Sequence, residues 1–122
     1  MHSVDKINLT DKLSQFSDYF NPRIVGDLNG QHVKLVKFKG DFVWHHHEEE
    51  DEMFLVIDGA FTMQLRDKDV LMEKGDFIII PKGTEHRPVA DEEVHVMLFE
   101  PASTLNTGNQ KNELTRDNLQ TI

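Results

Sequence analysis

The sequence predicts an all-β domain, folded as an antiparallel sandwich or barrel. Between residues 23 and 100 the chain is made of short segments, rich in β-branched residues, in which apolar and polar side chains roughly alternate. Turn-forming pairs such as Asp58-Gly59 and Lys74-Gly75 separate these segments. No helical segment lies between them, which disfavours a parallel α/β fold.

One short helix is expected before the strands. Apolar residues recur there at helical spacing, at Leu9, Leu13, Phe16 and Phe20. Thr10 is suited to cap the helix and Pro22 to end it, so the helix is expected over roughly residues 10–20. Its apolar face is expected to pack on the domain or on a partner subunit.

Seven to nine strands are expected to follow. The segments are RIVGDL, QHVKLVKFK, FVWHH, MFLVI, AFTMQLR, DVLME, FIIIP, HRPVA and VHVMLF. Asn29-Gly30 is a strong hairpin signal between the first two. After Pro101 the chain is polar, which predicts an extended tail, ordered only where it contacts the barrel or a neighbouring subunit. The predicted organisation is a lead-in with the helix over residues 1–22, one barrel over residues 23–101 and the polar tail over residues 102–122.

Composition excludes several classes of function. The 122 residues suit one domain, and 22 acidic against 13 basic residues give a net charge of −9. Such a surface repels nucleic acids and anionic membranes. The chain has no cysteine, so disulfides, thiolate zinc sites and cysteine nucleophiles are excluded. No run is apolar and long enough to span a bilayer and no signal peptide is apparent, so we expect a cytoplasmic protein.

The stretch VWHHHEEEDEMF, residues 43–54, contains three consecutive histidines followed by five acids. On a strand, His45 and His47 would share one face and His46 would take the other. Any acid from Glu48 to Glu52 could supply a carboxylate to that face. Glu52 is favoured because it begins the apolar strand MFLVI, whereas the acids before it suit a solvated turn.

A further histidine, His86, follows a Pro-x-Gly turn in PKGTEHRP. Three imidazoles and one carboxylate suit a divalent transition metal: Zn, Fe, Mn, Ni, Co or Cu. From the residues alone, an exposed polar loop without a metal is an equally good interpretation of the histidine-acid stretch.

Two motifs resemble those of the cupin superfamily. The first is GDFVWHHHEEEDEMFLVIDG, with Gly40, His45, His47, Glu52 and Gly59 at the motif positions. The second is GDFIIIPKGTEH, with Gly75, Pro81, Gly83 and His86. The resemblance covers roughly residues 30–100. The chain departs from the family pattern where the gap after Gly40 is one residue shorter and where Ala90 replaces a frequent Asn.

The resemblance implies a double-stranded β-helix, or jelly-roll barrel, of the small single-domain kind. It implies an internal metal held by His45, His47, Glu52 and His86. It also implies a homodimer, for which the helix and the strands over residues 23–38 are the candidate elements.

Pocket-lining residues are less well specified. Phe54 and Val56 share the strand parity of Glu52 and are candidates for substrate contacts. Met63, Met97 and Phe99 are further interior candidates. Ordinary core packing explains all five equally well.

We expect a small metal-dependent enzyme acting on a small molecule inside the barrel. The resemblance leaves open a dioxygenase, or a sugar isomerase or epimerase such as those similar to mannose-6-phosphate isomerase. A phosphosugar would require basic groups at the pocket mouth, and the acidic balance supplies no such cluster. The alternative is a cupin module that binds or senses a small molecule without catalysis.

Overall fold

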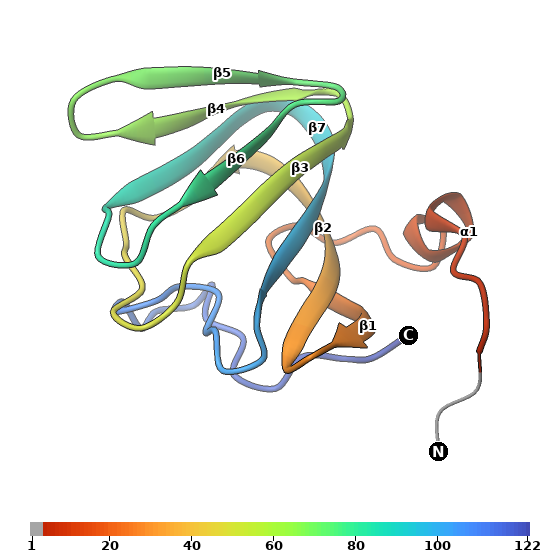
Figure 1. The fold of residues 1–122 in the computed structure, drawn as a ribbon. Coiled ribbons are helices and arrows are strands. Elements are labelled where there is room, and N and C mark those ends of the chain that lie inside the picture. Colours follow the sequence, from red (N-terminus) through yellow and green to blue (C-terminus); the bar gives the residue numbers. More distant parts are fainter. Residues whose placement is uncertain (1–3) are drawn as a thin grey trace.

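The computed structural model describes residues 4–122 and is almost entirely β-structure (Figure 1). Its elements are α1 (Leu9–Leu13), β1 (Arg23–Leu28), β2 (Gln31–Asp41), β3 (Glu52–Asp58), β4 (Ala60–Leu65), β5 (Asp69–Glu73), β6 (Phe77–Ile80) and β7 (His86–Pro101). The expected strands are confirmed with two exceptions. FVWHH is not a strand, and the last two segments form the single strand β7. No helix in the described part of the chain is long and apolar enough to cross a membrane.

All strand pairs are antiparallel, and they connect the strands in the order β1-β2-β7-β3-β6, with β4 pairing both β5 and β7. Backbone hydrogen bonds do not close the sheet into a complete cylinder, because within residues 4–122 β1, β5 and β6 each pair with one other strand only. The sheet curves around a common interior, which agrees with the jelly-roll prediction (Figure 1).

Strand β7 connects the two parts of the sheet. Its first residues, 86–89, pair with β4, and its last residues, 94–101, lie between β2 and β3. Between them the exposed residues 91–93 mark the bend, where the register with β2 shifts between Phe38 and Gly40. One strand therefore contributes side chains to both ends of the interior.

Two apolar clusters lie on opposite faces of the sheet. The interior cluster is aromatic-rich, with the Phe38 and Phe61 rings edge to face at 5.5 Å. The outer cluster forms where the lead-in and α1 cover β1 and β2; Leu13, Phe16, Val25 and Leu35 are its buried members. This alternation follows from strand parity, since neighbouring residues of β2 such as Leu35 and Val36 face opposite sides.

The helix is shorter than predicted. It ends at Leu13, with Asn8 rather than Thr10 as its N-cap. A helix continuing to residue 20 would place Leu13, Phe16 and Phe20 on one face. In the structure Phe16 joins the outer cluster and Phe20 the interior cluster, so the chain must leave the helical path between them.

The C-terminal segment, residues 102–122, is not the extended tail that was predicted. It folds into successive turns and buries Thr104 and Thr107. The Thr107 hydroxyl donates to the Gln110 carbonyl at 2.6 Å, and Thr121 forms a parallel bridge with Ile24. This polar segment has few apolar side chains to bury. Side-chain hydrogen bonds to its backbone hold it in place against the barrel instead.

Candidate metal centre

Four donor side chains reach the interior from three segments. Glu52 is the first residue of β3 and His86 the first residue of β7, while His45 and His47 lie in the loop between β2 and β3. This loop is extended without being a strand, and one bridge attaches it to the sheet. The amide of His45 donates to the His86 carbonyl at 3.1 Å, and the amide of His86 donates to the His45 carbonyl at 2.9 Å.

The extended backbone still gives the alternation expected of a strand. His45 and His47 are buried, whereas His46 between them is half-buried and contacts the exposed Glu48. Asp51 stays at the surface, where its carboxylate accepts a hydrogen bond from the Lys82 amide at 2.8 Å. The sequence therefore separated the inward from the outward side chains of this stretch correctly.

The four donors converge. One ligand atom from each of His45, His47, Glu52 and His86 lies within 4.8 Å of all the others. The Nε2 atoms of His47 and His86 lie 3.2 Å and 3.4 Å from Oε1 of Glu52. All four residues are at most 3% exposed. This spacing is suited to a single ion surrounded by the four groups.

Backbone carbonyls orient two of the imidazoles. Nδ1 of His45 lies 2.9 Å from the Val43 carbonyl, and Nδ1 of His86 lies 2.9 Å from the Thr84 carbonyl. Because a carbonyl only accepts, each Nδ1 must be the donor, which leaves the lone pair on Nε2. Metal-binding histidines are typically oriented in this way.

Several buried polar atoms in this cluster have no hydrogen-bond partner within residues 4–122. They are Nδ1 and Nε2 of His47, Oε1 of Glu52 and Nε2 of His86. Leaving a buried polar group unpaired costs folding free energy, so such atoms are rare without a role. A divalent cation would satisfy the atoms that face one another, and the donor set therefore fits a metal.

Protonation in the cluster also suits a cation. Burial, and then the neighbouring His86 ring, lower the pKa of His45 to about 3, which keeps its imidazole neutral. Burial raises the pKa of Glu52, but the close approach of Glu100, His47 and His86 outweighs it and holds that pKa well below its usual range. Burial, and then the adjacent Glu52 carboxylate, raise the pKa of Glu100 well above its usual range. Glu52 is thus the ionised member of the carboxyl pair.

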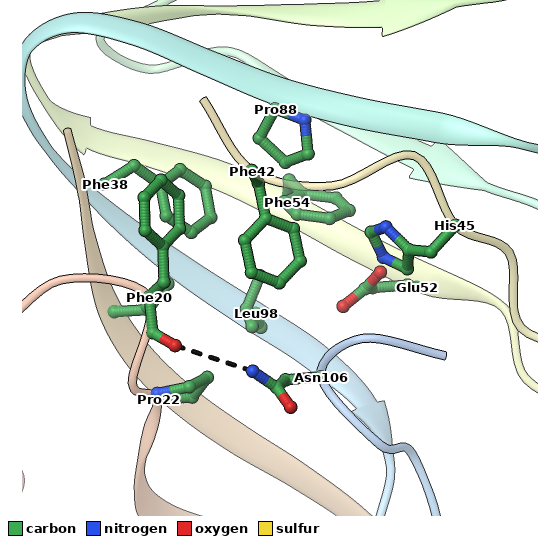
Figure 2. Close-up of a pocket in the computed structure, with 11 residues that line it drawn as sticks. Phe20, Pro22, Phe38, Phe42, His45, Glu52, Phe54, Pro88, Leu98 and Asn106 are labelled. Carbon is green, nitrogen blue, oxygen red and sulfur yellow. Dashed lines mark hydrogen bonds between the residues drawn. The ribbon is translucent and has the colours of Figure 1, made fainter. Parts of the chain in front are cut away.

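A small cavity of about 20 Å³ adjoins the donors, enough for about one water molecule (Figure 2). His45, Glu52 and Asn106 are its polar lining residues. Its apolar lining consists of Phe20, Pro22, Val36, Phe38, Phe42, Phe54, Pro88 and Leu98. Figure 2 shows the rings of Phe20, Phe38, Phe42 and Phe54 to the left of His45, and Asn106 below them with its side-chain amide directed at the Phe20 carbonyl. None of the lining residues from the described part of the chain is Lys or Arg.

The predicted pocket residues divide into three groups. Phe54 lines the cavity. Val56 and Met63 are buried in the interior cluster but do not line it. Met97 and Phe99 were placed wrongly, because Val96, Leu98 and Glu100 are the inward residues of this part of β7 and the alternate residues point outward. Met97 packs in the outer cluster instead.

Sequence reasoning missed other residues around the centre. Glu100 shares the strand parity of Val96 and Leu98, but both faces of VHVMLF are largely apolar, so alternation did not show which face is inward. Lys34 shares the parity of Val36 in the same way. Asn106 gave no signal, since its place at the cavity depends on how the C-terminal segment folds back.

Comparisons with known proteins agree with this geometry. A family model described as "Cupin domain" matches residues 32–100. A cupin-2 domain containing protein from Shewanella frigidimarina NCIMB 400 superimposes with a TM-score of 0.77 at 42% identity, covering 78% of this chain and 93% of that one. All four donor residues lie within the matched range.

Two curated relatives extend the comparison. Protein YdbB of Bacillus subtilis (strain 168) is 38% identical, covering 52% of this chain and 57% of its own length. An acireductone dioxygenase of Phaeosphaeria nodorum is 31% identical, covering 92% of this chain and 71% of its own length.

Proposed function

This chain belongs to the cupin domain family, and we propose that it is a metal-dependent dioxygenase acting on a small molecule bound inside the barrel. The observation that carries the proposal is the convergence of four buried donors with unpaired atoms beside an apolar cavity. The likeness to an acireductone dioxygenase, which extends over most of this chain, supports the choice of reaction.

His45, His47, Glu52 and His86 would hold the ion, and iron is the metal we propose first. Imidazole and carboxylate donors that leave coordination positions open are typical of non-haem iron oxygenases. When bound, the metal would supply the site at which dioxygen and a substrate oxygen are brought together. The chain's own contribution is to hold the four donors, and the apolar wall excludes water from the reacting groups.

The cavity lining indicates the kind of substrate. Four phenylalanines contribute to the wall, and among residues 4–122 it has no Lys or Arg to bind a phosphate. These features favour an uncharged molecule with an apolar part and an oxygen-bearing end directed at His45 and Glu52. They disfavour the alternative of a phosphosugar isomerase.

Substrate access requires part of this wall to move, since the cavity holds little more than one water molecule. The contact most suited to opening joins the lead-in to the C-terminal segment. The side-chain amide of Asn106 donates to the Phe20 carbonyl at a long 3.5 Å and to the Leu114 carbonyl at 2.9 Å. Phe20 also has a positive φ of 56°, which is unfavourable for a non-glycine residue.

The test begins with the metal content of protein purified without a histidine tag or added metal. Oxygen consumption is then measured with the iron-loaded protein and a panel of small catechols and enediols, with and without a chelator. We expect chelator-sensitive oxygen uptake that His47→Ala abolishes. Stoichiometric zinc, with no oxygen uptake after iron loading, would contradict the dioxygenase.

We also propose a homodimer, formed through the outer sheet face. Cross-strand pairing places Ile79, Met53 and Phe99 in one row across β6, β3 and β7, and Phe77, Leu55 and Met97 in the next. Phe77 and Ile79 are 61% and 56% exposed. An exposed apolar strip of this kind can pair with itself around a two-fold axis. The double variant Phe77→Glu/Ile79→Glu is expected to be monomeric by light scattering, and a wild-type monomer would refute the dimer.

A further inference from the structure

A buried lysine and glutamate lie directly behind one donor of the candidate metal centre. Nζ of Lys34 lies 2.8 Å from Oε1 of Glu100, and both side chains are at most 2% exposed. Neither residue is among the four donors that converge on the centre. Burying a lysine and a glutamate away from water is costly, and a well-packed apolar pair is often at least as stable. Packing alone does not account for them.

Strand order brings this pair to Glu52. The central strand β7 lies between β2 and β3, so Glu100 has β2 on one side and β3 on the other. On the β2 side, Glu100 is opposite His32, and Lys34 reaches it diagonally. On the β3 side, Met53 is opposite Phe99, which brings Glu52 opposite Glu100. The three ionisable side chains therefore form a row across three adjacent strands.

The contacts within the row have a direction. One oxygen of Glu100 accepts from Lys34. The other, Oε2, is buried and has no hydrogen-bond partner within residues 4–122. The cross-strand register places the Glu100 carboxyl beside that of Glu52. Oε1 of Glu52 faces His47 and His86. Glu52 is thus held from behind by Glu100, which is in turn held by Lys34.

We propose that Lys34 and Glu100 are positioning residues that fix the carboxylate of Glu52 toward the metal. The proposal rests on the proposed metal centre and adds to it two residues that contact a donor without binding the metal. Without Glu100 the Glu52 side chain loses the contact that orients its carboxylate. Without Lys34, Glu100 loses the charge that holds it in place. Groups behind a ligand typically contribute 10- to 100-fold to metal affinity.

Strand β2 provides a matched control. Lys37 is a second buried lysine, three residues further along, with Nζ donating to the Phe16 carbonyl at 2.6 Å. It packs on the outer side of the sheet beside the Phe16 ring, away from Glu52. Lys37→Met and Lys34→Met therefore each remove one buried ammonium group from the same strand, and only Lys34→Met removes a group connected to Glu52.

The experiment measures Co²⁺ binding by the full chain, by absorption spectroscopy and by competition with a chelator, alongside thermal unfolding of the metal-free protein. Glu100→Leu is expected to weaken Co²⁺ binding by about 10- to 100-fold and Lys34→Met by about tenfold, both with altered Co²⁺ absorption. Glu100→Gln keeps an acceptor for Lys34 and a donor for Glu52, so its spectrum should stay close to wild type. Lys37→Met should lower thermal stability and leave the Co²⁺ affinity unchanged.

Two results would overturn the inference. If Lys34→Met and Glu100→Leu bind Co²⁺ like Lys37→Met, with the wild-type spectrum, the pair is only structural. If Glu100→Leu does not fold, the comparison of the two lysine variants decides the question alone. A wild-type chain that binds no Co²⁺ would instead overturn the metal centre, and the role of the pair with it.

Discussion

Two parts of the barrel interior satisfy their buried side chains in opposite ways. Around β4 and β5 the interior is apolar and closely packed, with Phe61, Met63 and Met72 at most 2% exposed. Around His45, His47, Glu52 and His86 it is polar, and several buried atoms have no partner within residues 4–122. The first part contributes folding free energy by burying apolar surface. The second reduces it, which is the expected property of a site kept ready for a ligand.

The largest expected effect comes from the apolar part. Phe61→Ala removes a ring that packs edge to face on Phe38 and should lower the free energy of unfolding by about 3–5 kcal/mol. Chemical denaturation measures this loss. Because Phe61 does not line the cavity or belong to the donor set, Co²⁺ affinity should be unchanged. A joint loss of stability and affinity would show that the two parts are not independent.

The polar part should depend on metal. A metal that binds only the folded chain, at about 100 times its Kd, stabilises it by about 2.7 kcal/mol, and a chelator should remove this increment. Differential scanning calorimetry with and without chelator provides the measurement. If thermal unfolding is insensitive to both metal and chelator, the polar part of the interior is not a metal site and does not differ from the apolar part in this respect.

Replacing a donor by an apolar residue sharpens the contrast. His47→Leu removes two buried nitrogens that have no partner and should leave the metal-free protein as stable as wild type, or more stable by about 1 kcal/mol. The same variant should lose the response to chelator. Denaturation of both proteins in chelator tests this, and a marked loss of metal-free stability would mean that His47 has a structural role.

Disturbing the contact between the C-terminal segment and the histidine loop should lower stability by a similar amount. Gly108 has a φ of 54°, and a Cβ there would lie 2.2 Å from the His46 carbonyl oxygen. Gly108→Ala should therefore displace the segment and lower stability by at least about 1 kcal/mol. Limited proteolysis should then cleave after residue 101 first. Unchanged resistance to proteolysis would indicate that the histidine loop adjusts to the new side chain without loss of stability.

The smallest effect is expected for a glutamate–histidine pair that is exposed to solvent. At the surface, Glu93 Oε2 lies 2.7 Å from Nε2 of His95, and the hydrogen bonds from His95 and Tyr19 lower the pKa of Glu93. A carboxyl group whose pKa is lowered by folding stabilises the fold at pH values above its pKa in the unfolded chain, about 4.3. This contribution is lost as the pH falls through the pKa of the folded chain. Glu93→Gln should therefore cost about 0.3 kcal/mol near pH 7 and nothing well below pH 4, measured by denaturation at both pH values. A larger loss of stability at neutral pH would mean that this exposed pair contributes as strongly as a buried one.

Local patterns predicted most of the fold and the donor set. Alternating segments and turn residues marked the bounds of β1 and β5, because both signals act within a few residues. The inward positions of His45 and His47 followed from backbone alternation, although the segment is not a strand. His86 was a candidate from its place after a Pro-x-Gly turn, but only the resemblance to a known motif placed it beside them, since the contact joins segments about forty residues apart.

The rest depended on packing that local patterns do not encode. Phe16 and Phe20 have helical spacing, yet they are needed on opposite faces of the sheet, so the helix stops at Leu13. Met97 and Phe99 were assigned to the interior because both faces of β7 are apolar, which removes the parity signal. Asn106 and Thr107 belong to a polar segment whose position follows from hydrogen bonds with the rest of the chain.

The attachment of that segment to the histidine loop limits how modular the barrel is. The His46 amide donates to the Asn109 side chain at 2.9 Å, and the Asn109 amide donates back to the His46 carbonyl at 3.0 Å. A chain shortened to the family match at residue 100 would keep every metal donor but lose both of these hydrogen bonds to the loop that holds two of the donors. Grafting this metal centre onto another barrel would therefore mean transferring the C-terminal segment with it.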